Sequence, residues 1–130
     1  MCLIHSIPFH SDKPIVAYKV MEVTHQTRLK SISAGNCYNL HETHQATQPH
    51  NELKVCYCLE YGVGFHAYKK LEDANRHRLL LLTLFENIQV VEVELSEVTH
   101  KGKDIIGNDY DRCVVDAYVA KQCKFIRIVE

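Results

Sequence analysis

A strand passes directly into a helix within the stretch Gly64-Phe65-His66-Ala67-Tyr68-Lys69-Lys70-Leu71-Glu72-Asp73-Ala74. Successive side chains of a strand point to opposite faces, so Phe65 and Ala67 share one face, and Gly64, His66 and Tyr68 share the other. The first face suits a hydrophobic core. The second face carries a histidine and a tyrosine beside a position without a side chain. That combination is typical of a ligand-binding face and equally of an ordinary half-buried face.

A helix over residues 71–85 is the clearest helical prediction in the sequence. Glu72 and Asp73 fall in its first turn, where the helix dipole favours negative charge. In residues 79–85 every side chain except that of Thr83 is large and apolar. A helix that packs on one side buries only a stripe of about 100°. The second half of the helix is therefore expected to lie deep in the core or to contact another protein.

Strands are predicted on both sides of this helix. Residues 91–95 alternate strictly between apolar and acidic side chains, which indicates a half-buried strand. We expect four residues to be buried, namely Phe65, Val91, Val93 and Leu95. We expect His66 and Glu92 to face away from them. Further strands are predicted over residues 14–23, 36–40, 52–60, 113–119 and 123–129, and loops over residues 41–51 and 101–111.

These elements predict an α+β fold, with a small, mainly antiparallel sheet and one main helix at about residues 71–85. The 130 residues suit a single domain, in which residues 1–13 form an N-terminal arm. The formal net charge of −1, without a long run of like charges, argues against a nucleic-acid partner.

Cytoplasmic localisation is expected, because no segment approaches the roughly 20 apolar residues that span a bilayer. Residues 1–10 lack the basic start and the small-residue cleavage site of a signal peptide, and we expect no membrane partner. Six cysteines in a cytosolic protein are expected to be thiols or metal ligands and not disulfides.

A cluster of zinc-binding residue types raises the alternative of a zinc-binding module. The candidates fall within one short stretch and are Cys37, His41, His44, His50, Cys56 and Cys58. Their spacing is not that of a zinc finger or ribbon. Loop histidines in solvent and cysteines packed as small apolar residues explain the same pattern. We therefore expect no metal and no other cofactor.

The central motif Gly64-Phe65-His66-Ala67 is flanked by Ala17-Tyr18-Lys19-Val20, Gly35-Asn36-Cys37-Tyr38, Val91-Glu92-Val93-Glu94-Leu95 and Phe125-Ile126-Arg127-Ile128-Val129-Glu130. The order of these motifs, from near Pro14 onward, resembles a family of small, uncharacterised proteins common in phages, prophages and gut bacteria. The resemblance implies a compact α+β fold and an origin in a mobile element, but no activity. The chain departs from the family at Tyr68, where a second cysteine is usual, in its apolar residues 79–85, and in residues 41–51, which look inserted.

An ADP-ribosyltransferase-like enzyme that uses NAD is a second alternative. A strand with an aromatic residue, the strand-to-helix step and the later Glu92-x-Glu94 are loosely similar to the layout of that group. His66 and Tyr68 would clamp the nicotinamide and ribose, and a carboxylate would stabilise an oxocarbenium-like transition state. A Cys-His hydrolase that uses Cys56 or Cys58 with His66 has less support, because nothing in the sequence orients the base.

The reading that we adopt is a non-enzymatic protein that binds another protein, for example a host or defence component, or a second copy of itself. The sequence contains no Gly-rich phosphate loop and no nucleophile motif, whereas the apolar helix end and the aromatic and histidine face suit contact with a partner. Small proteins of phages often act by occluding a host protein, which is an analogy of origin. The predicted binding residues are Tyr18, His66, Tyr68, Leu80, Leu81 and Leu84.

Overall fold

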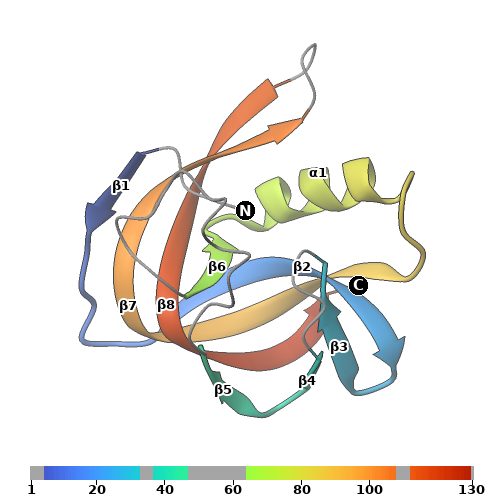
Figure 1. The fold of residues 1–130 in the computed structure, drawn as a ribbon, viewed down its shortest axis with the longest axis horizontal. Helices are drawn as coiled ribbons and strands as arrows, with labels where there is room; N and C mark the ends of the chain where they lie inside the picture. The colour runs from blue at the N-terminus through green and yellow to red at the C-terminus, as the bar shows by residue number, and fades with distance from the viewer. Residues whose placement is uncertain (1–4, 33–36, 47–63, 108–111, 130) are drawn as a thin grey trace, which may run out of the picture.

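The computed structural model describes residues 5–32, 37–46, 64–107 and 112–129, and is shown in Figure 1. Within these ranges, eight strands and one helix follow one another. They are β1 (His5–Pro8), β2 (Ile15–His25), β3 (Arg28–Ser31), β4 (Cys37–Asn39), β5 (Thr43–Gln45), β6 (Phe65–Tyr68), α1 (Leu71–Leu81), β7 (Ile88–Gly107) and β8 (Arg112–Val129).

The predicted α+β class is wrong, because the protein is nearly all β. Strands hold 67% of the described residues and the helix only 11%. Much of the difference lies in β7 and β8. Residues 101–107 were expected in a loop but continue β7, and the two strands predicted near the C-terminus are one strand, β8.

The strands pair so that the sheet curls into a ring. β7 pairs with β2 along one edge and with β8 along the other, β8 pairs with β6, and β6 meets β2 again at the single pair Tyr18 and Tyr68. All of these pairings are antiparallel. β1 adds to β7, β5 adds to β8, and β3 and β4 extend the sheet beyond β2. We call the four strands β2, β7, β8 and β6 the strand ring.

The long strands bend where their pairing register shifts. In the β7–β8 pair the register shifts between Val98 and His100, and Glu97 adopts a positive φ of 54° just before this point. An extra residue of this kind bends a strand and increases its twist. The bend lets one half of β7 pair with β2 and the other half with β1.

The inside of the strand ring is filled by apolar side chains, which we call the inner cluster. It contains Val91, Val93, Leu95, Phe65 and Phe125, all buried, as predicted for the first four. The rings of Tyr38, Phe65 and Phe125 pack against one another at centroid distances of 5.0 to 6.3 Å. Buried aromatic groups of this kind contribute much of the packing energy of a small core.

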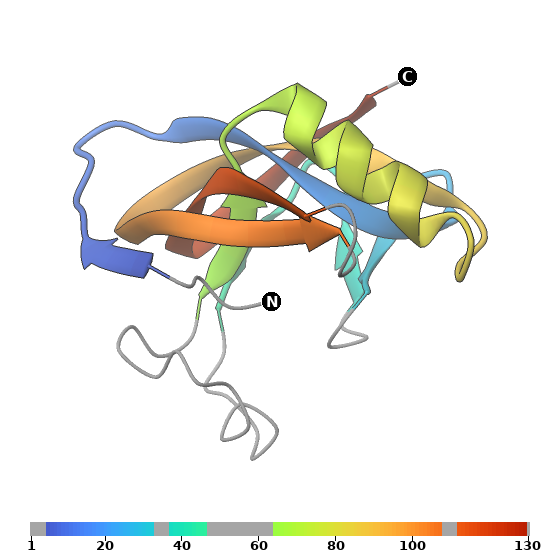
Figure 2. The ribbon, with the colours of Figure 1, turned by 90° about the horizontal axis from the view of Figure 1, so that it is seen from above.

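Helix α1 covers the outer face of the sheet, as Figure 2 shows. Beneath it lies the outer cluster, in which Leu71 and Ala74 of α1 pack with Tyr68 and with apolar residues of β7 and β8. Strict alternation explains the two clusters, since neighbouring residues such as Val90 and Val91 belong to opposite faces. No helix in the described part of the chain is long and apolar enough to cross a membrane.

Three other predictions differ from the structure or lie outside it. The helix ends at Leu81, four residues earlier than expected, and Leu82 to Leu84 form a turn. Residues 43–45 form β5 within a segment predicted as a loop, because they pair with β8. The predicted strand over residues 52–60 lies outside the described residues.

Gly64 is required by the close approach of β8. A Cβ atom at this position would overlap Cγ1 of Val119 and would lie 3.0 Å from the carbonyl oxygen of Ala120. This packing explains why the strand-to-helix step begins with a glycine, whose absent side chain permits the close contact.

Replacing Val93 by Asp is expected to lower the free energy of unfolding by several kcal/mol, because Val93 is 0% exposed and an unpaired carboxylate would enter the inner cluster. Val114→Asp is the matched control, since Val114 also lies on a ring strand but is 58% exposed. Chemical denaturation of both variants measures the difference. An unchanged unfolding midpoint in Val93→Asp would contradict the position of β7 in the core.

Candidate functional site

Helix α1 presents two chemically different faces. Asp73 and Ala74 are buried against the sheet, and His77 lies one turn further along the same side. On the other side, the end of the helix exposes large apolar residues. The fold thus places a polar, hydrogen-bonded group under α1 and an apolar surface at its end.

A three-residue hydrogen-bonded group lies between α1 and the sheet. The hydroxyl of Tyr68 on β6 donates to Oδ2 of Asp104 on β7 at 3.2 Å, and lies 2.9 Å from Nδ1 of His77. A phenol has one proton, so Nδ1–H of His77 donates to the Tyr68 oxygen. The backbone N–H of Ile105 donates to Oδ1 of Asp104 at 2.8 Å. These bonds fix the tautomer of His77.

Burial controls the charges of this group. The pKa of Tyr68 is raised by burial and by the charge of Asp104, so the phenol stays protonated. Burial raises the pKa of Asp104, opposed by its hydrogen bonds from Ile105 and Tyr68, and burial lowers the pKa of His77. With Tyr68 only 2% exposed, the group acts as a clamp that holds α1 in register on the sheet.

A second polar group occupies the junction between β2 and β6. Lys19 follows the alternation of Ala17 and Met21 into the strand ring, and its Nζ donates to the carbonyl oxygen of His66 at 2.5 Å. No described carboxylate forms an ion pair with Lys19. Burial lowers the pKa of the lysine and outweighs the opposing effect of Cys123.

The same burial affects the neighbours of Lys19. The pKa of His66 is lowered to about 3, by burial first and by the positive charge of Lys19 second. Burial raises the pKa of the Cys123 thiol to about 12. A thiol with a raised pKa is a poor nucleophile at neutral pH.

The structure brings three of the predicted binding residues to the outer face. Tyr18 and Tyr68 pair directly across β2 and β6, and His66 shares their face by alternation. Helix α1 covers part of this face, and Tyr68 is buried. Of the predicted leucines, Leu80 and Leu84 are exposed and Leu81 is half-buried.

The carboxylates of the enzyme alternative lie on β7. Glu92 pairs opposite Tyr18 and forms an ion pair with Arg127 at 3.3 Å, and Glu94 pairs opposite Val16. Two hollows, one at an end of the strand ring and one near Phe9, are lined by residues other than Glu92 and Glu94.

The zinc candidates within the described residues have other partners or lie apart. Nε2 of His44 accepts a hydrogen bond from the backbone N–H of Asn39 at 3.3 Å, and its ring packs against Tyr38 and Phe125. Cys37 and His41 are exposed. In the described ranges no three His, Cys, Asp or Glu side chains are placed to hold a metal. His50, Cys56 and Cys58 lie outside those ranges.

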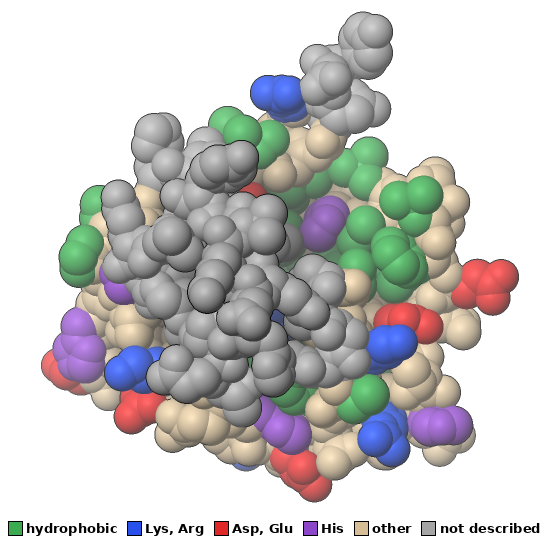
Figure 3. All heavy atoms as spheres, viewed as in Figure 1, with side chains coloured by type: hydrophobic (Ala, Val, Ile, Leu, Met, Phe, Trp, Pro, Cys, Tyr) green, Lys and Arg blue, Asp and Glu red, His purple; other side chains and the backbone are tan. Residues whose placement is uncertain are grey.

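The end of α1 and the following turn form an exposed apolar area, which we call the leucine surface. It consists of Leu79, Leu80, Leu82, Leu84 and Phe85. Leu84 is 75% exposed and Leu79 is 63% exposed. In Figure 3, hydrophobic side chains gather on the right of the molecule, where Figure 1 places α1.

Sequence reasoning missed His77, Asp104 and Lys19 as members of polar groups. His77 stands three residues after Ala74 and four after Asp73, which places it on the buried stripe of the helix. Asp104 lay in a segment expected to be a loop. Lys19 alternates with Ala17 and Met21, which was a signal that its side chain points inward.

Stability is expected to depend on pH through His66. Its pKa is about 3 in the folded protein and about 6.5 when unfolded, so the unfolded chain binds a proton first on acidification. The stabilising contribution is complete above about pH 6.5 and is lost as the pH falls from there toward 3. Between pH 7 and pH 4 the free energy of unfolding should fall by up to about 3 kcal/mol through this residue.

The variant His66→Gln should flatten this part of the pH profile, as measured by denaturation at several pH values. His25→Gln is the matched control, because it makes the same substitution at a histidine that is exposed at the end of β2. If His66→Gln keeps the full wild-type slope, His66 is not held neutral in the fold.

Comparison of the chain with protein-family models, with curated proteins and with solved structures gave no match. The family resemblance carried by Gly64-Phe65-His66-Ala67 and its flanking strands stays a prediction from these motifs.

Proposed function

We propose that this protein acts by binding another protein through the leucine surface. The observation that carries the proposal is the exposure of five large apolar residues within seven positions, Leu79, Leu80, Leu82, Leu84 and Phe85. Single exposed apolar residues are normal on a soluble protein, whereas contiguous exposed patches mark interaction sites. The occupant is a folded partner that offers a complementary apolar groove.

The leucine surface is held in place from beneath. Nε of Arg78 donates to the carbonyl oxygen of Ile88 at 2.8 Å, which ties the last turn of α1 to the start of β7. The hydroxyl of Thr83 donates to the carbonyl oxygen of Leu80 at 3.0 Å. The backbone N–H groups of Leu84 and Phe85 both donate to the carbonyl oxygen of Leu81 at 2.9 Å. A surface that is ordered before binding loses less conformational entropy on association.

Burial of the leucine surface by a partner contributes favourable free energy to association. Full burial of one leucine or phenylalanine side chain contributes about 1.5–3 kcal/mol relative to exposure. Leu79 and Leu84 expose most of their surface, so a partner that covers them gains a large part of that amount for each. A few central apolar residues of this kind usually dominate the affinity of an interface.

The finer parts of the proposal rest on the family resemblance. A protein of mobile-element origin would meet its partner in the cytoplasm of the host cell, and a host or defence protein is the proposed partner. Self-association through the same surface is the second form of the proposal, and sedimentation of the purified protein separates the two.

Replacing Leu84 by Glu should abolish partner binding while the fold survives, because Leu84 is highly exposed and a charge there meets an apolar partner. The partner is first identified by affinity capture from the host and mass spectrometry, and its dissociation constant is then measured with purified proteins. Val114→Glu is the matched control, since Val114 is also exposed but lies on β8. Wild-type affinity in a folded Leu84→Glu variant would refute the leucine surface as the binding site.

The enzymatic alternative makes the opposite prediction. His66→Ala and Glu94→Ala should leave partner binding intact, and their biological effect should equal that of the wild type. If both folded variants lose the biological effect while they still bind the partner, the protein is a catalyst.

The zinc alternative is tested by elemental analysis of the purified protein after dialysis. We expect no stoichiometric zinc, since loop histidines in solvent and cysteines packed as small apolar residues account for the sequence pattern. About one zinc per chain, lost in Cys56→Ser, would contradict this expectation.

A further inference from the structure

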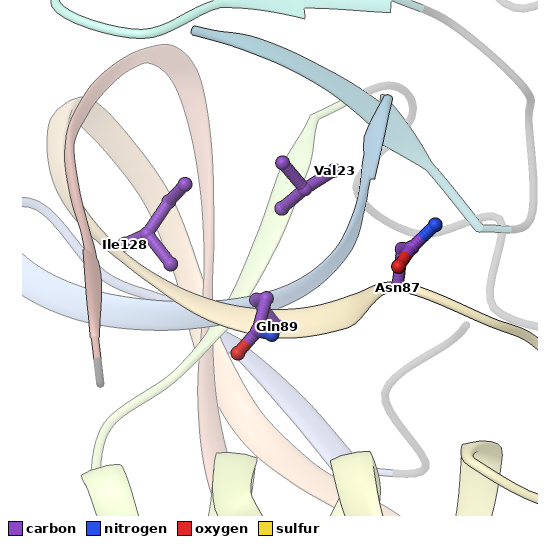
Figure 4. A pocket seen from close by; sticks show the side chains of 4 residues that line it. All are labelled: Val23, Asn87, Gln89 and Ile128. Carbon is purple, nitrogen blue, oxygen red and sulfur yellow. The ribbon is translucent and has the colours of Figure 1, made fainter. Parts of the chain in front are cut away.

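The inner cluster leaves a hollow at one end of the strand ring. It lies where β2 ends, β7 begins and β8 ends, and Figure 4 shows the side chains around it. The hollow has a volume of about 280 Å³ and is lined by Val23, Asn87, Gln89 and Ile128.

The lining combines apolar walls with amide groups. Val23 and Ile128 are half-buried and pack against the inner cluster from two different strands. Gln89 lies on the inward face of β7, by alternation with Val91 and Val93. Among the described residues, neither the Gln89 nor the Asn87 side-chain amide has a hydrogen-bond partner. The hollow therefore offers apolar contact and unused hydrogen-bonding groups together.

The rim of the hollow is fixed by the backbone. Asn87 adopts a positive φ of 56°, a conformation that asparagine tolerates better than most residues. Its carbonyl oxygen accepts a hydrogen bond from the N–H of Val23 at 2.9 Å, which ties the start of β7 to β2. This bond orders one side of the rim, between Asn87 and Val23.

The size of the hollow suits one aromatic ring with a polar substituent. An apolar cavity of about 150 Å³ binds benzene, and sites for drug-sized ligands begin near 300 Å³. A phenol and an indole are both larger than benzene, and each carries one hydrogen-bond donor. The amide oxygen of Gln89 is a suitable acceptor for that donor.

We propose that this hollow receives a tyrosine or tryptophan side chain of the partner protein. The inference rests on the proposed function and names the anchor residue of that partner. Its support is that the hollow and the leucine surface adjoin along the chain, because Asn87 on the rim follows Phe85 of the leucine surface by two residues. Aromatic anchors in pockets, surrounded by apolar contacts, are the usual energetic centres of protein interfaces.

Titration with indole tests the hollow without the partner. Methyl NMR signals of Val23 and Ile128 should shift in a saturable way, with a dissociation constant on the order of 1 mM, as for other small fragments. Val23→Phe should fill the hollow and weaken indole binding at least tenfold, while Val114→Phe makes the same change on an exposed part of β8 and should have no effect.

Gln89→Leu provides a milder second variant in case Val23→Phe fails to fold. It should weaken indole several-fold but leave benzene unchanged, because only the hydrogen bond is lost. Absence of a saturable shift in the wild-type protein would overturn the proposal, and so would equal indole binding in all the variants.

Partner binding completes the test. Folded Val23→Phe should bind the partner at least tenfold more weakly than the wild type, and Val114→Phe should bind it equally. If Leu84→Glu loses the partner but Val23→Phe keeps it, the hollow proposal fails alone. If both variants keep wild-type affinity for the partner, the proposed function fails as well, even where indole still binds.

Discussion

The pairing of β7 with β8 is the constraint on which the rest of the structure depends. The two strands pair from Val90 and Val129 at one end to Gly107 and Arg112 at the other. Four further strands add to the edges of this hairpin, since β2 and β1 pair with β7, and β6 and β5 pair with β8. The pair of Tyr18 and Tyr68 then joins β2 to β6. Because the hairpin bends, its edges curve toward each other and the ring can close. The inner cluster then stabilises the curvature from inside.

Alternation made part of this fold predictable. Residues 91–95 alternate apolar and acidic side chains, and Val91, Val93 and Leu95 are buried as expected. Beyond the bend the pattern continues in a less familiar form, in which Asp104 and Ile106 are buried and Ile105 is exposed. A buried aspartate and nearby glycines look like a loop in sequence. The strand forms there because β8 supplies hydrogen-bond partners and Tyr68 donates to Asp104, which are long-range contacts that a local pattern does not contain.

The end of α1 also differs from what its local sequence predicts. Residues 79–85 have the composition of a buried helix, yet the helix ends at Leu81 and most of the leucines are exposed. Local composition cannot reveal that Arg78 is bonded to Ile88, or that the chain must turn back at Asn87 to begin β7. The apolar run was expected to lie deep in the core or to contact another protein, and its residues are instead largely exposed in the described structure. The described part of the domain leaves this surface uncovered.

The two sides of α1 therefore have complementary physical roles. Beneath the helix, Tyr68 bonds to both His77 and Asp104, and a buried polar network of this kind is costly unless all its members are satisfied. That requirement allows few positions for α1, so it specifies the register of the helix better than apolar contacts alone would. On the other side of the helix, exposure of the leucine surface to water is unfavourable for the protein. A partner that covers this surface would bind more tightly for that reason. Because polar contacts hold the helix in one position, its apolar end can stay on the protein surface and does not pack into the core of the same domain.

The junction of β2 and β6 follows a similar logic. The two strands pair at only Tyr18 and Tyr68, so if the ladder continued, His66 would lie opposite Val20. Instead the strands separate, and the amine of Lys19 donates to the His66 carbonyl in place of a backbone N–H. A buried amine without a carboxylate partner is unfavourable, but an unsatisfied buried carbonyl would be unfavourable as well. The lysine thus closes the strand ring where the backbone cannot. The long side chain of Lys19 reaches the His66 carbonyl, so a charged residue type occurs beside the apolar residues of the inner cluster.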